Sequence, residues 1–165
     1  MTKTKTILVL SFAAVVAVSM IVLPTALAAG HGFAVEKAVA QKDKKTFDVV
    51  FALSSVPAVT NWGVAIPTKG GFLGVTEHDA LGPDSAGQPG LHTHFVKVTT
   101  DTFECPSGVL VTSVSFEEVG TAELVGNAII VEDVPKKIGK KLKTDQAFSF
   151  GISLNTSENG VCLNP

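Results

Sequence analysis

The feature that most constrains the fold of this chain is a two-residue alternation of hydrophobic side chains that recurs along most of its length. In the clearest case, Phe148, Phe150, Ile152 and Leu154 are separated by single serine or glycine residues. Successive side chains of a β-strand point to opposite faces, so this alternation predicts a strand with one buried face. Similar alternations or short apolar runs occupy residues 33–40, 47–53, 62–66, 72–78, 91–98, 110–116 and 128–134.

These segments predict an all-β protein of about eight or nine short strands. No window of the sequence has a convincing helical period, and glycine, proline, asparagine and serine interrupt the apolar segments at short intervals. Short strands with such punctuation are typical of a single-domain antiparallel β-sandwich, Greek-key or immunoglobulin-like, with a small β-barrel as the alternative. Residues 33–40 are expected to form an edge strand.

Residues 1–28 have the three-part layout of a secretory signal peptide. Two lysines precede a long apolar stretch, and an Ala-Leu-Ala sequence supplies the small residues that a signal peptidase reads. Cleavage after Ala28 would leave a single β-sandwich domain, residues 29–165, of 137 residues. The alternative is an uncleaved membrane anchor, because residues 7–29 are 23 residues without a charge and can span a bilayer. Either way we expect the domain outside the cytoplasm, secreted or at the cell surface.

The expected mature domain is mildly acidic and contains no arginine. The full chain has a formal charge of −2, and loss of the two leader lysines would make it −4. Nucleic-acid binding depends on clustered basic side chains, so no nucleic-acid partner is expected. The one charge run, residues 135–145, holds five lysines. It is interpreted as a solvated loop that discourages edge-to-edge aggregation, or alternatively as a contact for an anionic envelope polymer or lipid headgroups.

The two cysteines, Cys105 and Cys162, fit an exported protein. An even number of cysteines in an oxidising compartment favours one disulfide, which would tie the middle of the domain to its last strand. The alternative is thiolate ligation of a metal or catalysis. It is disfavoured because the sequence has no C-x-x-C motif and neither cysteine neighbours a histidine.

Three of the four histidines, His78, His92 and His94, fall within seventeen residues. The apolar segments 72–78 and 91–98 are joined by a glycine- and proline-rich stretch, which predicts a β-hairpin with a long loop. Pairing around that loop would place His78 opposite His92, and His94 would share their face because alternate residues of a strand point the same way. We therefore expect the three imidazoles to converge at one end of the hairpin.

Such a cluster should be neutral, because charged imidazolium groups so close together would repel one another. Three neutral ring nitrogens on a rigid strand pair suit zinc or copper, with a fourth position open to water, a carboxylate or a substrate. Glu77 would point to the other face, so Asp79 is the better carboxylate candidate. The alternative is a set of hydrogen-bonded histidines that caps the core without a metal.

Two family resemblances rest on the His-x-His sequence. His92-Thr93-His94 followed by Cys105, with a second cysteine near the C-terminus, is similar in layout to copper/zinc superoxide dismutases, which are β-sandwiches. Those enzymes need further histidines and an aspartate downstream, and this chain has no histidine after His94. Cupins also open with His-x-His, but a glutamate is expected where Val98 and Thr99 stand here. Neither motif is complete, so the chain is not assigned to either family.

Two further sites depend on processing. Cleavage after Ala28 would create an N-terminal Ala29-Gly30-His31, whose amine, amides and imidazole can wrap copper(II) or nickel(II) in a square plane. The alternative is a flexible tail with an incidental histidine. Asn155-Thr156-Ser157 is an N-glycosylation sequon, expected on an exposed turn.

Other chemistries find little support in the sequence. It contains no G-x-S-x-G elbow and no phosphate-binding loop, and its paired acids are adjacent in strands, so they point to opposite faces. We therefore predict an exported β-sandwich that binds copper or zinc in a binding or carrier role, and an enzyme is the less favoured class. The alternative is a non-catalytic cell-envelope module whose loops contact protein or polysaccharide. The membrane is a partner only if the leader stays uncleaved.

Overall fold

The structure is a computed structural model and describes residues 32–78, 90–100, 105, 108–115, 117–155 and 160–165. Within these residues the chain forms ten β-strands and almost no helix. The strands are β1 (Val35–Asp43), β2 (Thr46–Leu53), β3 (Trp62–Thr68), β4 (Gly71–Glu77), β5 (Leu91–Thr99), β6 (Val109–Val114), β7 (Thr121–Val125), β8 (Ala128–Pro135), β9 (Phe148–Asn155) and β10 (Gly160–Asn164). The helical elements are α1 (Lys136–Gly139) and a 3-10 turn at Thr144–Gln146.

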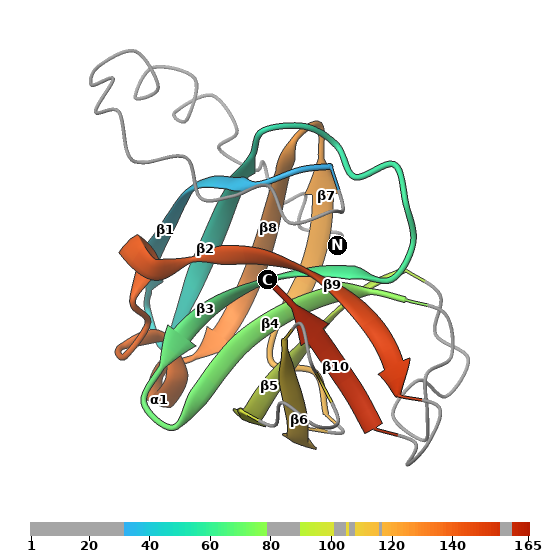
Figure 1. Cartoon of the computed structure of the whole chain (residues 1–165). Helices are drawn as coiled ribbons and strands as arrows, with labels where there is room; N and C mark the ends of the chain where they lie inside the picture. Colours follow the sequence, from blue (N-terminus) through green and yellow to red (C-terminus); the bar gives the residue numbers. More distant parts are fainter. Residues whose placement is uncertain (1–31, 79–89, 101–104, 106–107, 116, 156–159) are drawn as a thin grey trace.

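The strands form two antiparallel sheets, one open and one closed. The open sheet has the order β1-β2-β8-β7, and the closed barrel has the order β10-β6-β5-β4-β3-β9. In Figure 1, β3 and β9 of the barrel cross in front of the upright strands of the open sheet. The all-β prediction is confirmed, and the structure contains both a two-layer packing and a small barrel. The expected edge strand is also present, because β1 lies at one end of the open sheet.

The main core lies between the open sheet and the outer wall of the barrel. Alternate residues of β3 (Trp62, Val64 and Ile66) are buried there against residues of β2 and β8 such as Phe51 and Ile129. All of these side chains are at most 1% exposed. The large alternate residues of β3 therefore pack between the two layers.

A second, smaller core fills the inside of the barrel. The residues between those of the first set point inward, so Ala65 of β3 packs with Val96 of β5, Phe150 of β9 and Leu163 of β10. We call this interior the lumen. Both faces of β3 are thus buried, and small residues occupy its lumen side.

The charge run at residues 135–145 is not a simple loop, which corrects the sequence interpretation. Its lysines are exposed as expected, but the backbone forms α1 and the 3-10 turn, and Ile138 and Leu142 pack against the main core. A Cβ on Gly139 would lie 2.5 Å from Cδ2 of Phe47, so the helical turn fits closely against β2 only because residue 139 is glycine. Ile138 and Leu142 lie four residues apart, and this spacing is the sequence signal that could have indicated the helical turn.

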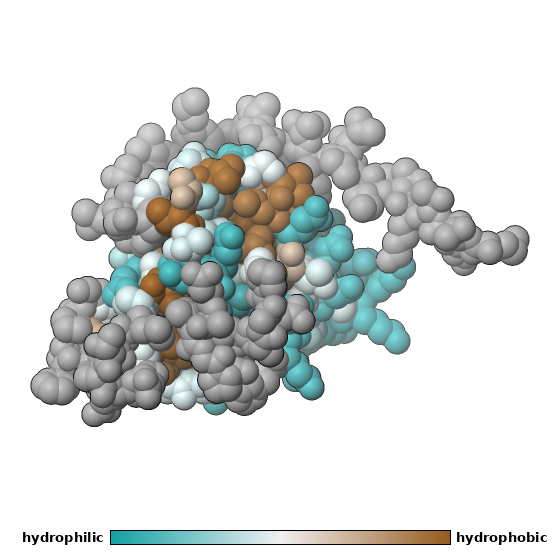
Figure 2. All heavy atoms as spheres, turned by 90° about the vertical axis from the view of Figure 1, so that its right-hand side faces the viewer, coloured by the Kyte–Doolittle hydropathy of each residue, from teal (hydrophilic) through white to brown (hydrophobic). Residues whose placement is uncertain are grey.

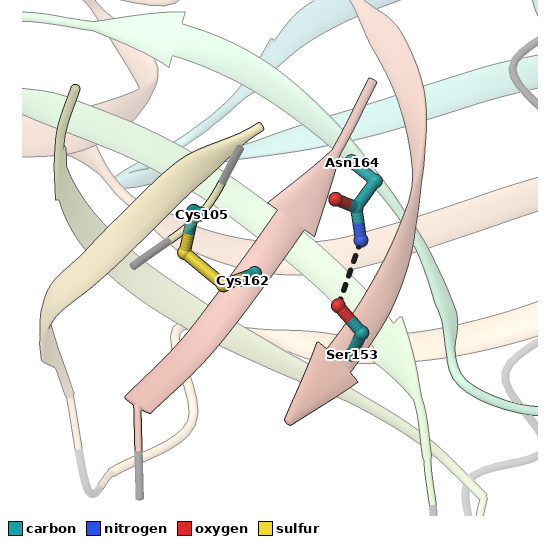
Figure 3. Close-up of a disulfide and its surroundings, with 4 residues drawn as sticks. All are labelled: Cys105, Ser153, Cys162 and Asn164. Atoms are coloured by element: carbon teal, nitrogen blue, oxygen red, sulfur yellow. Dashed lines mark hydrogen bonds between the residues drawn. A yellow bond between two sulfur atoms is a disulfide. The ribbon is translucent and has the colours of Figure 1, made fainter. Parts of the chain in front are cut away.

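Cys105 and Cys162 form the predicted disulfide, with 5.6 Å between their Cα atoms. The bond reaches β10 from the segment just before β6. Among the described residues, these two strands share only the pairs Leu110–Cys162 and Val109–Leu163. On the other side of β10, the Asn164 amide donates a 3.0 Å hydrogen bond to the Ser153 hydroxyl of β9 (Figure 3). The disulfide therefore reinforces the shortest pairing of the barrel.

The disulfide is compatible with an extracellular protein. Among the described residues, no helix has the length and apolar character needed to cross a membrane. The large hydrophobic side chains that are exposed in the same residues are all valines: Val39, Val56, Val59 and Val125. On the face shown in Figure 2, brown hydrophobic areas lie beside teal hydrophilic ones and beside grey atoms.

Candidate metal centre

The hairpin of β4 and β5 brings His78, His92 and His94 together, as predicted. The predicted register is wrong by two residues, because Thr76, and not His78, pairs with His92, and Gly74 pairs with His94. A shift of two keeps every side chain on its face, whereas a shift of one would have reversed it. His92 and His94 therefore point into the lumen, and His78 follows directly after the end of β4.

The three imidazole rings pack closely. Nε2 of His78 lies 2.9 Å from Nε2 of His92, and the ring centroids of His92 and His94 are 4.8 Å apart. One ring nitrogen from each of the three residues lies within 4.8 Å of the others. His92 and His94 are only 7% and 6% exposed. The group is thus a buried set of nitrogen donors that could hold a metal ion.

Two hydrogen bonds determine which nitrogen of His92 and His94 carries its proton. Nδ1 of His92 lies 2.9 Å from the carbonyl oxygen of Gly90, and Nδ1 of His94 lies 3.2 Å from that of Ser115. A carbonyl oxygen only accepts, so each Nδ1 carries a hydrogen and donates it. In the neutral ring this leaves the lone pair on Nε2. Metal-binding histidines are usually oriented in this way, by donating their second ring N–H to a backbone carbonyl or a carboxylate.

The spacing is near that of a metal site without matching it fully. Two nitrogens bound to one tetrahedral zinc at 2.0–2.1 Å are about 3.3 Å apart, by simple geometry. The 2.9 Å separation of His78 and His92 is slightly shorter, and the largest separation in the cluster reaches at most 4.8 Å. Ring movements of about 1 Å would bring the three nitrogens onto one ion. Without a metal the 2.9 Å contact is a hydrogen bond, which His78 Nε2–H donates to the lone pair of His92 Nε2.

The lumen around the cluster is shaped by small and apolar residues. Gly74 stands opposite His94 and brings no side chain, so the imidazole meets no Cβ there. The hydroxyl of Thr76, opposite His92, is buried and makes no hydrogen bond to any described residue. Thr93, whose side chain points to the other face of β5, hydrogen-bonds to Gly120 and Val119. One face of β5 therefore carries His92 and His94, and the other face bonds to the segment before β7.

Of the predicted site residues not described above, the structure places only Asn155. Asp79 and His31 lie outside the described residues, so neither is placed relative to the cluster. Asn155 is the last residue of β9, paired with Gly160, whereas Thr156 and Ser157 fall outside the described residues. Glycosylation of Asn155 stays a prediction.

Away from the histidine cluster, a hollow of about 480 Å³ lies between the β3–β4 turn and the helical segment. Its rim carries charges of both signs, with Lys69, Lys137 and Lys141 near Glu117 and Glu118. This mixture selects for neither an anionic nor a cationic ligand. The histidine cluster is therefore the site with the more specific chemistry.

Sequence reasoning missed the supporting groups of this centre. The carbonyls of Gly90 and Ser115 act through backbone atoms, which no side-chain pattern reveals. Thr76 pairs with His92 in the structure, in the place that the predicted register gave to His78. The missing information was the register of the hairpin, which differs by two residues from the predicted one.

Comparison of the chain with protein-family models, with curated proteins and with solved structures found no match.

Proposed function

We propose that this protein is an exported metal-binding protein that holds a transition-metal ion through His78, His92 and His94, in a binding or carrier role. The observation that carries the proposal is that three imidazole nitrogens lie within 4.8 Å of one another in a largely buried site. Burying three polar rings together is costly unless their nitrogens are paired or coordinated. One metal ion would satisfy all three.

The donor set favours copper or zinc. Neutral imidazole is a borderline ligand that suits both ions, whereas magnesium and calcium prefer oxygen. The two Nδ1–H donations to Gly90 and Ser115 leave Nε2 of His92 and His94 as the coordinating atoms. Three protein ligands leave a fourth position for water, Asp79 or another small ligand.

The proposed location outside the cytoplasm rests on the leader and on the disulfide. Residues 1–28 have the composition of a signal peptide, and the bond between Cys105 and Cys162 is compatible with an oxidising compartment. A carrier role there needs only reversible binding of the ion. The alternative is a cell-envelope module in which the histidines are a hydrogen-bonded part of the barrel and the loops bind protein or polysaccharide.

Metal analysis tests the proposal directly. The mature domain, refolded with its disulfide formed and dialysed against zinc or copper, should retain about one ion per chain. His92→Ala and His94→Ala should lose the ion held by the cluster, because two donors cannot hold it against dialysis. His31→Ala is the matched control, since it removes the only histidine outside the cluster.

The circular dichroism spectrum of each variant shows whether it is folded. A folded wild-type domain that retains neither ion would refute the metal-binding function and favour the envelope module. Metal that is lost in His31→Ala and kept in His92→Ala would instead point to the Ala29-Gly30-His31 terminus.

A further inference from the structure

The hydroxyl of Thr76 is an unusual polar group inside the barrel. Thr76 is only 5% exposed, its Oγ1 is shielded from solvent, and that atom makes no hydrogen bond within the described part of the chain. Leaving a buried hydroxyl unsatisfied costs about 1–3 kcal/mol. Valine has nearly the same shape and would avoid this cost. A threonine at this position therefore suggests a hydrogen-bond partner for the hydroxyl that is not among the described residues.

The position of Thr76 limits where that partner can be. Its two cross-strand neighbours are Gly63 of β3 and His92 of β5. The space above Gly63 is taken by the ring of Phe150, because a Cβ there would lie 2.7 Å from Cε2 of that ring. Phe150 is apolar and offers the hydroxyl no conventional hydrogen bond. The partner therefore belongs on the other side, toward the histidines.

The distance to the cluster is short. Side chains directly opposite one another on neighbouring antiparallel strands have Cβ atoms about 5 Å apart, and Thr76 and His92 are such a pair. His78 comes two residues after Thr76. The Thr76 side chain is thus opposite His92, whose Nε2 lies 2.9 Å from Nε2 of His78.

The proposed metal would also carry a positive charge that none of the described donors compensates. A divalent ion held by three neutral imidazoles keeps its full charge, and the donor group in the described residues contains histidines and no carboxylate. In the low dielectric of a protein interior, that charge attracts an anion strongly. An anion bound to the metal beside Thr76 could accept a hydrogen bond from the hydroxyl.

We propose that the metal centre binds a small exogenous anion in its remaining coordination position, and that the Thr76 hydroxyl donates a hydrogen bond to this anion. This inference rests on the proposed metal-binding function and names the class of ligand that the same site would take. The ligand is an anion of only a few atoms, because side chains such as Val96 and Phe150 fill much of the lumen. Thr76 acts as a specificity-determining residue and makes no bond to the metal.

Azide binding to the cobalt(II)-loaded domain tests this proposal, since the visible spectrum of cobalt(II) reports its ligands. Wild-type protein should show a saturable spectral change on titration with azide. Thr76→Val and Thr76→Ala both remove the hydroxyl and should raise the azide dissociation constant about tenfold, equivalent to about 1.4 kcal/mol. Thr76→Ser keeps the hydroxyl and should stay close to the wild type. Thr68→Val is the control for loss of a buried threonine elsewhere in the barrel wall.

The outcomes separate the two proposals. Failure of the folded wild type to bind cobalt would overturn the metal site itself. Cobalt binding with equal azide affinity in the wild type, Thr76→Val and Thr76→Ala would overturn the role of Thr76 and leave the metal site intact. Cobalt binding with no spectral response to azide in the wild type would show that the fourth position is closed to anions.

Discussion

The ring of Phe150 lies against the backbone of Gly63, where a Cβ would stand 2.7 Å from Cε2 of the ring and 2.9 Å from the carbonyl oxygen of Val75. An aromatic ring can enter the barrel at this level only because β3 has no side chain there. The ring closes the lumen on the side of Thr76 away from the histidines, so it helps to determine the size of the proposed anion site.

Gly63→Ala should destabilise the domain. The added Cβ meets both the ring and a backbone oxygen that cannot move independently, and such overpacking costs about 1–3 kcal/mol. Gly74→Ala is the matched control on the neighbouring strand, because a Cβ there would be 3.5 Å from Cγ2 of Val96, an ordinary contact. It should leave stability unchanged or raise it by up to about 1 kcal/mol. Urea unfolding measures both changes, and equal stability of the two variants would contradict this account of the lumen.

Metal should stabilise the folded domain through the histidine cluster. An ion that binds only the native state adds about 2.7 kcal/mol when its free concentration is one hundred times the dissociation constant. For a domain of this size we expect the melting temperature to rise by roughly 10 °C with zinc. His78→Ala should abolish that increase, and His31→Ala should retain it. A zinc-induced shift that survives in His78→Ala would remove His78 from the ligand set.

Thr93→Val should weaken the contact between the barrel and the segment that leads into β7. The Thr93 hydroxyl donates to the carbonyl oxygen of Gly120 at 2.6 Å and accepts from the backbone N–H of Val119 at 2.8 Å. Valine would leave both groups unsatisfied, at a cost of about 2–3 kcal/mol. Thr93→Ser retains both bonds and loses only a methyl group, so it should cost about 1 kcal/mol. Thermal unfolding checks the order of the two variants, and a reversed order would argue against these bonds.

Removal of the disulfide should destabilise the barrel closure. Cys105 and Cys162 are 57 residues apart, and the loop-entropy model assigns about 4 kcal/mol to a closure of that length. The double variant Cys105→Ser/Cys162→Ser should lose stability by that order. Its amide hydrogens in β10 should also exchange faster than those in β2, because the β6–β10 pairing is short. Uniform acceleration over both sheets would show that the disulfide has no local effect on that pairing.

Processing of the leader can be measured on the exported protein. Intact mass should correspond to residues 29–165 with two hydrogens lost to the disulfide. Cleavage at another position would abolish the Ala29-Gly30-His31 copper site, and a full-length mass would favour the membrane-anchored alternative.

Much of the fold could be predicted from the sequence because strand patterns are local. The alternation at residues 148–154 and at residues 62–66 identified β9 and β3 nearly to their ends. Strand β7 was missed, since it has only five residues and a weak pattern. Strand β10 was anticipated only as the last strand that carries Cys162, without its bounds. Which strands close the barrel could not be predicted. The pairing of Trp62 with Gly151 joins residues far apart in the chain, and nothing in either segment specifies its partner.

The shared face of the three histidines was predictable because it depends on the parity of the hairpin and not on its exact register. His78, His92 and His94 share a face for any even shift, so the two-residue error did no harm. The lumen was not predicted, although the sequence has a trace of it: Gly63 and Ala65 alternate with Trp62, Val64 and Ile66. The large side chains of Trp62, Val64 and Ile66 suggest a face that packs against another layer. The small residues Gly63 and Ala65 suggest a face that lines a narrow interior.

Strand β5 serves two interiors with two independent sets of residues. Leu91 and Phe95 support the interface with the open sheet, and His92 and His94 project into the barrel. Replacement of His92 and His94 by other donor residues would change the ligand that the molecule can bind, and Leu91 and Phe95 would keep their packing. The strand is thus a ready-made template on which new coordination chemistry could be engineered, or could have evolved, without redesign of its support.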